Sequence, residues 1–214
     1  MQQNNKKTSE TNTIHKKTRL QEIKFLVLAD LEDFKTKDII EELNELKRRH
    51  FDIVFILGNI PDTLTLEIST LFESSLICQL AEDYYSPILF QELGVVDFNL
   101  KKQKLSTAHV CGVGSSFYNL KTRNLEAIDN PNFKGNILVS YYPPLFNEYS
   151  FEEHGNKHIK TISKHINKFI KEKQPSLIIF RGNKRKFEKK LKNGTKLYCC
   201  HGIQVIQTTI EVEI

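Results

Sequence analysis

Acidic and amide side chains stand at the ends of several apolar runs in this sequence. Asp30 and Glu32 follow the first run, Asn59 follows the second, and Asp83 lies shortly after the third. Ligands of open α/β sheets bind where the carboxyl ends of the strands converge, so these side chains are expected to share one crevice. Oxygen donors of this kind favour a hard ion such as Mg²⁺, Mn²⁺ or Ca²⁺. A single-ion site formed by these four residues is one interpretation.

A second interpretation needs no ion. Two arginines, Arg181 and Arg185, occur late in the chain. Either guanidinium can pair with Asp30 and Glu32, or the polar strand ends can simply remain in water. We favour this interpretation over the ion site.

A basic stretch surrounds these arginines. Its first members are Arg181, Lys184, Arg185 and Lys186, and further lysines continue it to position 192. Such a loop can hold a phosphate or a nucleic-acid backbone electrostatically, without hydrolysis. The alternative is a solvated turn in a lysine-rich chain.

The elements that position these residues follow from hydrophobic patterning, in which continuous apolar runs indicate buried strands and a 3.6-residue period indicates amphipathic helices. Helices alternating with strands imply parallel strands joined by crossovers, and therefore an α/β fold. The expected strands are Lys24–Ala29, Ile53–Leu57, Leu76–Gln79, Val95–Leu100, Lys104–Val113, Ile137–Ser140, Leu177–Phe180, Lys196–Cys200 and Gln204–Ile214, and the expected helices are Lys35–His50, Thr63–Ser74, a short one near Ile88–Leu93, and Lys157–Lys173.

Length and composition limit the organisation further. The 214 residues, with 39% hydrophobic side chains, suit one domain over residues 22–214, preceded by a disordered basic tail over residues 1–21. No apolar run is long enough for a membrane span or a signal peptide, so we expect a cytoplasmic protein.

The four cysteines lack metal-site spacing and are expected to be reduced thiols in the core. The net charge of +5 is compatible with a phosphate-bearing ligand without requiring one.

Known catalytic and nucleotide-binding patterns are missing from the sequence. No glycine-rich nucleotide loop follows a strand, and no Ser-His-Asp or Cys-His arrangement can be assembled from the spacing. We expect His109, His158, His165 and His201 to be structural histidines.

The order of the strand-end motifs resembles that of the calcineurin-like metallophosphoesterases, over residues 24–214. The segments that carry the resemblance are Gly112–Ser116, Ile137–Pro144, His154–Lys157, Lys173–Pro175 and Phe180–Arg185. Members of this family place the motifs D-x-H, G-D, G-N-H/C-D, H and G-H-x-H at strand ends, and hold two divalent metals bridged by an aspartate.

Most of the metal ligands that the resemblance implies are replaced here. Asp30 matches the first aspartate, but Glu32 stands where the first histidine belongs and Asn59 where the bridging aspartate belongs. The remaining positions fall on Asp83, Tyr84, Tyr141, Asn183 and Arg185, so that no motif histidine is left. Two adjacent divalent ions repel each other, and without imidazole and bridging carboxylate ligands little offsets that repulsion.

The resemblance implies a four-layer α/β/β/α sandwich of two mixed β-sheets. It also implies a degenerate site without a resident cofactor, and hence a non-catalytic scaffold or interaction module with a protein partner, comparable to the retromer small subunit. Two alternatives stay open. One is a metal-dependent phosphoesterase with an oxygen-rich site, and the other is phosphate or nucleic-acid binding through residues 181–192.

Overall fold

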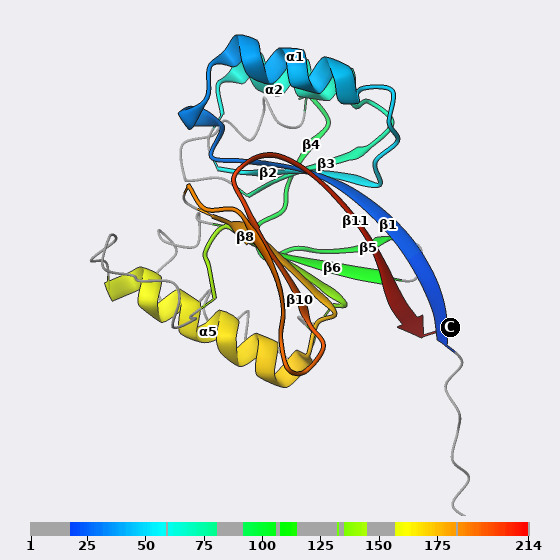
Figure 1. Cartoon of the computed structure of the whole chain (residues 1–214), viewed down its shortest axis with the longest axis vertical. Helices are drawn as coiled ribbons and strands as arrows, with labels where there is room; N and C mark the ends of the chain where they lie inside the picture. The colour runs from blue at the N-terminus through cyan, green and yellow to red at the C-terminus, as the bar shows by residue number, and fades with distance from the viewer. Residues whose placement is uncertain are drawn as a thin grey trace, which may run out of the picture.

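Two β-sheets lie face to face in the structure, which is a computed structural model (Figure 1). It describes residues 18–58, 60–80, 92–105, 108–114, 132, 135–144, 157–182 and 184–213. The first sheet has the strand order β11-β1-β2-β3-β4, and the second has the order β5-β6-β7-β8-β10-β9. Both sheets are mixed, because parallel strands form the interior of each, with one antiparallel edge strand in the first sheet and two in the second.

The first sheet contains the earliest apolar runs of the chain. Its parallel strands are β1 (Thr18–Ala29), β2 (Ile53–Leu57), β3 (Leu76–Leu80) and β4 (Val95–Asp97), and β11 (Gly202–Glu213) runs antiparallel to β1. The β1–β11 pairing extends over 12 residues of each strand, from Thr18 opposite Glu213 to Ala29 opposite Gly202. The two ends of the described chain are therefore joined in one ladder.

The second sheet is built from the later part of the chain. Its strands are β5 (Lys102–Leu105), β6 (Ala108–Val113), β7 (Ile137–Ser140), β8 (Leu177–Arg181), β9 (Phe187–Lys190) and β10 (Lys196–Cys200). The central strands β6, β7, β8 and β10 are parallel, and β5 and β9 are antiparallel edges. The carboxyl ends of the four central strands therefore meet at one edge of this sheet.

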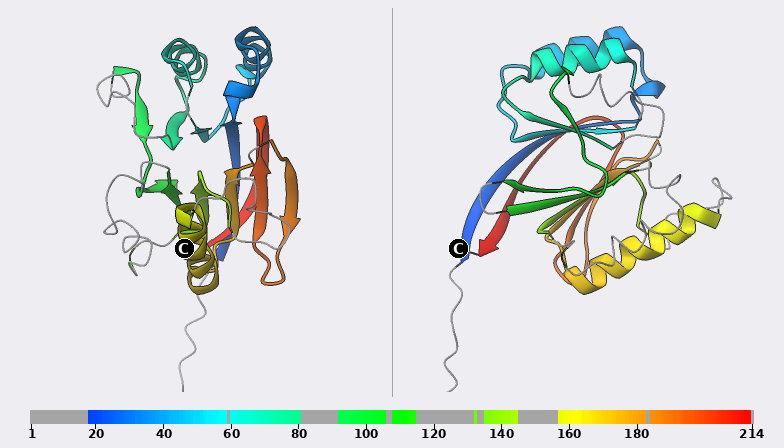
Figure 2. Two further views of the ribbon diagram at one scale, coloured as in Figure 1. Left: turned by 90° about the vertical axis from the view of Figure 1, so that its left-hand side faces the viewer. Right: turned by 180° about the vertical axis from the view of Figure 1, so that it is seen from behind.

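Helices cover the outer face of each sheet, as the two views in Figure 2 show. Helices α1 (Thr36–Leu46) and α2 (Asp62–Leu71) pack on the first sheet, and α5 (Lys157–Lys173) packs on the second. A short 3₁₀ helix, η1 (Leu31–Asp33), follows β1. The predicted four-layer α/β/β/α sandwich is confirmed by this arrangement.

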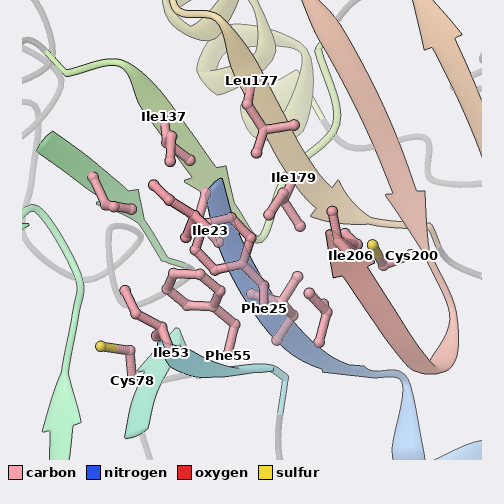
Figure 3. Packing of buried hydrophobic residues seen from close by; sticks show 14 of the residues in the cluster. Ile23, Phe25, Ile53, Phe55, Cys78, Ile137, Leu177, Ile179, Cys200 and Ile206 are labelled. Atoms are coloured by element: carbon pink, nitrogen blue, oxygen red, sulfur yellow. The ribbon is translucent and has the colours of Figure 1, made fainter. Parts of the chain in front are cut away.

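The main core lies between the two sheets (Figure 3). Phe25 and Phe55 from the first sheet face Ile137 and Ile179 from the second, and all four side chains are fully buried. Neighbours along each strand point the other way, towards the helices, as the side-chain alternation of a strand requires. Burial on both faces explains why these strands are almost continuously apolar.

The structure corrects three of the predicted elements. Strand β1 begins at Thr18, so residues 18–21 are in a strand, whereas the sequence placed them in the tail. The single strand predicted at Lys104–Val113 is an antiparallel pair, β5 and β6. Strand β9 lies within the stretch predicted to be a basic loop. The tail residues 1–17 and most of the short helix near Ile88–Leu93 lie outside the described residues.

None of the helices in the described ranges is both long enough and apolar enough to cross a membrane.

All four cysteine thiols are buried and none forms a disulfide, as the sequence predicted. Burial raises the pKa of Cys78 to about 12 and that of Cys111 to about 12, with Lys101 and Lys102 partly opposing it. Burial likewise raises the pKa of Cys200. Since the thiolate is the reactive form, these side chains combine poor access with a strong preference for the neutral thiol.

We predict that the native protein does not react with a thiol reagent such as DTNB at pH 8, because no cysteine is both exposed and ionised. Unfolding in guanidinium chloride should release four reactive thiols within the mixing time. The absorbance of the released thionitrobenzoate measures the number of reactive thiols per chain. Labelling of even one thiol in the native protein at a rate comparable to that of free cysteine would contradict this packing.

Candidate functional site

Asp30, the residue after strand β1, has an unusual backbone conformation. Its φ of 55° and ψ of 39° lie in the left-handed region, and its side chain is 1% exposed. Residues other than glycine adopt this conformation at a cost of roughly 1–2 kcal/mol, and aspartate is among those that tolerate it best. The turn directs the chain into η1, which carries Glu32 and Asp33. A buried carboxylate and two further carboxylates thus follow one strand.

Arg181, the last residue of β8, reaches these carboxylates from the opposite sheet. Its Nε donates a hydrogen bond to Asp30 Oδ1, and its Nη2 lies 2.7 Å from Glu32 Oε1. Its Nη1 donates to the hydroxyl of Tyr141, and the guanidinium carbon lies 4.7 Å from the centroid of that ring. The pairing with Arg181, one of the two that the sequence left open, is the one present in the structure.

The surroundings keep this guanidinium charged. Burial alone would lower the pKa of Arg181, but Tyr141, Asp30 and Glu32 outweigh it and the pKa is raised. The side chain is 19% exposed, so most of its charge is balanced within the protein and little of it by water. The centre of the site is therefore a permanent cation.

His201 completes the environment of Asp30. It follows strand β10, and its Nδ1 lies 3.1 Å from Asp30 Oδ2. A carboxylate can only accept hydrogen bonds, so the proton of this contact belongs to Nδ1. The imidazole also lies 5.1 Å from the Phe34 ring, centroid to centroid. Both carboxylate oxygens of Asp30 therefore have a partner.

Two glycines shape the backbone around Arg181. Gly58, at the end of β2, has a φ of 127°, and a Cβ built on it would lie 3.9 Å from Arg181 Nε and from Tyr141 Cε2. A Cβ on Gly182 would lie 1.9 Å from the carbonyl oxygen of Arg185, which leaves no space for any side chain. Close packing of the backbone thus holds the start of the basic stretch in a tight turn.

That turn separates the members of the predicted basic loop. Arg181 points into the site, whereas Lys184 is exposed, with its Nζ 3.8 Å from Asp33 Oδ1. Arg185 is half-buried, and its carbonyl oxygen accepts a contact of 3.4 Å from the thiol of Cys199. Lys186 is exposed. Among these four residues, Arg181 is the one whose side chain contacts Asp30 and Glu32.

The structure brings together Asp30, Glu32, Tyr141 and Arg181 from the predicted set. Asn59, Asp83, Tyr84 and Asn183 lie outside the described residues. His201, which the sequence analysis assigned to a purely structural role, is a member of the site. Its position at the carboxyl end of a strand parallel to β8 was the signal that could have identified it.

The residues that are described do not fit the metal pair that the family resemblance implies. Cations need lone pairs, but both oxygens of Asp30 and one of Glu32 already bond to Arg181 or His201. The guanidinium offers a positive charge and no lone pair. Across the described part of the chain, no group of three or more His, Cys, Asp or Glu side chains is arranged to hold a metal ion.

No protein-family model and no curated protein sequence matches this chain. Similar solved structures include a single mutant of Vps29 from Entamoeba histolytica, with 11% identity, a TM-score of 0.41, and coverage of 83% of this chain and 73% of that one. Another is a conserved uncharacterized protein from Streptococcus pneumoniae described as a predicted phosphoesterase, with 10% identity, a TM-score of 0.42, and coverage of 90% and 84%.

A third similar structure is GAP50 of Plasmodium, described as the anchor in the inner membrane complex, with 10% identity, a TM-score of 0.46, and coverage of 84% of this chain and 71% of that one. None of these similarities bears on the activity of this chain.

We predict that Arg181→Met destabilises the protein by about 3–5 kcal/mol, because it leaves the buried carboxylate of Asp30 without its cationic partner. The double variant Asp30→Asn with Arg181→Met should recover part of that loss, since no unpaired charge is then buried. Urea unfolding followed by circular dichroism measures both.

Arg49→Met is the matched control, because Arg49 is exposed on the surface, and it should change stability by no more than about 0.5 kcal/mol. If Arg181→Met were as stable as the control, the ion pair would not hold in solution.

Proposed function

We propose that this protein is a non-catalytic binding module with a metallophosphoesterase-like fold, in which the Arg181 side chain takes the place of catalytic cations. The observation that supports this most directly is the contact of one guanidinium with Asp30 and Glu32 together. The four-layer fold supplies the framework, and the internal ion pair supplies the reason for the absence of chemistry.

Electrostatics supports the proposal quantitatively. Two unit charges 4 Å apart interact by about 4 kcal/mol at an effective dielectric constant near 20, so a divalent ion at that distance from a guanidinium is repelled by about 8 kcal/mol. Arg181 balances one of the two negative charges that would compensate this repulsion, and its donors and His201 already occupy both oxygens of Asp30 and one of Glu32. Binding a metal here would first require the arginine to leave.

The ion pair also has a structural role that does not depend on catalysis. Asp30 belongs to the end of the first sheet and Arg181 to the end of the second, so their contact connects the two sheets at their carboxyl edge. His201 and Tyr141 reach the same two side chains from β10 and β7. The crevice that binds ligands in other open α/β sheets is here crossed by protein side chains.

The phosphoesterase alternative requires Asp30, Glu32, Asn59 and Asp83 to share an ion. Two of these four side chains are bonded to Arg181, and the other two lie outside the described residues. Phosphate binding at residues 181–192 would have to proceed without Arg181, whose donors point towards Asp30, Glu32 and Tyr141. Both alternatives therefore receive less support than the binding module.

We expect purified wild-type protein to show no turnover of bis-p-nitrophenyl phosphate above buffer in 1–10 mM Mn²⁺ or Mg²⁺, and no change of melting temperature with either ion. Arg181→Gln removes the competing cation and should gain a weak, saturable stabilisation by Mn²⁺. Ligand linkage gives about 1.4 kcal/mol at tenfold excess of ion over its dissociation constant. Calorimetric titration and thermal melts measure these effects.

Arg49→Gln, with the same charge change at an exposed position, should remain insensitive to Mn²⁺. The proposal would be wrong if wild-type protein hydrolysed the substrate in a metal-dependent manner and Asp30→Asn abolished that turnover while the fold, checked by circular dichroism, was kept.

A further inference from the structure

Charge is distributed very unevenly between the helices of the two outer layers. Helix α1 has four acidic residues against one lysine, and α2 has two acidic residues and no basic one. Helix α5, on the opposite side, has six lysines against one glutamate, and no acidic residue in its first turn. Figure 1 shows that α1 and α2 lie together on one face and α5 lies alone on the other. The net charge of +5 is thus modest, although the outer face formed by α5 is strongly basic.

The lysines of α5 form a stripe on its solvent side. Lys164, Lys168 and Lys171 are exposed, and their i, i+4, i+7 spacing puts them on one face of the helix. The opposite face is apolar, and its buried Ile166 and Phe169 pack on the second sheet. At a rise of about 1.5 Å per residue, the stripe extends over about 10 Å. Because its apolar side packs on the sheet, the helix presents these three lysines to solvent.

The β9–β10 turn extends the basic surface beyond the end of α5. The hydroxyl of Thr195 donates a hydrogen bond of 2.7 Å to the carbonyl oxygen of Pro175, two residues after the helix ends at Lys173. This contact joins the start of β10 to the segment that links α5 to β8, three residues from the exposed Lys192 of the β9–β10 turn. Figure 1 draws that turn and α5 at the same end of the molecule. Lysines from two separate elements thus share one face.

We propose that this face, defined by Lys164, Lys168, Lys171 and Lys192, binds the phosphate backbone of double-stranded nucleic acid without reading its sequence. Lysine ammonium groups act as point charges, which suit phosphates and carry little base specificity. The surface is separate from the Asp30–Arg181 site, so this inference is independent of the proposed function.

The chemistry of the face favours a duplex over the two other polyanions. Single-stranded nucleic acid is held by aromatic side chains on which its bases stack, and an interfacial membrane helix inserts apolar side chains. The large apolar side chains that the described residues expose are Leu20, Phe34, Leu66 and Val205, and none of them belongs to α5, β9 or the turn that follows β9. The apolar side of α5 is occupied by its own sheet. Phosphate contacts alone suffice for sequence-independent duplex binding.

The test compares two triple variants by fluorescence anisotropy on a labelled 20-base-pair duplex, as DNA and as RNA, at several salt concentrations. Lys164, Lys168 and Lys171 are changed to glutamine in the first variant. Exposed Lys35, Lys37 and Lys47 on the α1 side are changed to glutamine in the second, which alters the net charge equally. We expect wild type and the second variant to bind alike, and the first to bind about tenfold more weakly or worse at 50 mM salt.

The salt dependence gives a second readout. Each lost phosphate contact reduces the slope of log K against log salt by about 0.9, so the first variant should lose about 2.7 from that slope if all three lysines contact phosphate. Equal weakening of both variants would show a net-charge effect only and overturn the proposal. Failure of wild type to bind either duplex at 50 mM salt would overturn it too, as would binding confined to vesicles of phosphatidylserine and phosphatidylcholine or to a single strand.

Discussion

The contact between the buried carboxylate of Asp30 and the guanidinium of Arg181 determines what this fold can do. Removing two charges from water is expensive, and the cost is recovered only when each charge finds a close partner and further hydrogen bonds. Glu32, Tyr141 and His201 supply those bonds. The ends of the strands, where open α/β sheets bind their ligands, are here occupied by side chains that bond to one another. Such a set leaves little free energy to be gained from an added cation.

Much of the fold was predictable because most strands are buried on both faces. Strands β2, β7 and β10 occupy the same residues as the apolar runs that predicted them. The errors fall on strands that lack this burial. The first residues of β1 are exposed and pair with β11 alone, and β9 is a short edge strand of sequence FEKK. Both segments are strands because they pair with a neighbouring strand, and hydrophobic patterning does not detect such pairing.

The site was predictable in its positions and less so in its contacts. Strand ends identified Asp30, Glu32 and Tyr141, but residue type alone could not choose between Arg181 and Arg185. The choice follows from alternation, since Leu177 and Ile179 face the other sheet and Arg181 continues their side of β8. Arg185 lies beyond a turn that only Gly182 permits. The sequence did not identify His201, because its histidines were compared only with known catalytic arrangements. Its contact with Asp30 follows from its position directly after β10.

The long ladder between β1 and β11 ties the order of folding to the order of synthesis. Strand β1 is the first element of the sandwich to be made, yet its whole length on one side is covered by the last strand. Until that strand has left the ribosome, β1 presents an unpaired edge, and such edges invite pairing with other chains. Contacts so distant along the chain also slow folding, because the loop between them must close first. A nascent chain of this protein therefore exposes that edge until its last strand has been made.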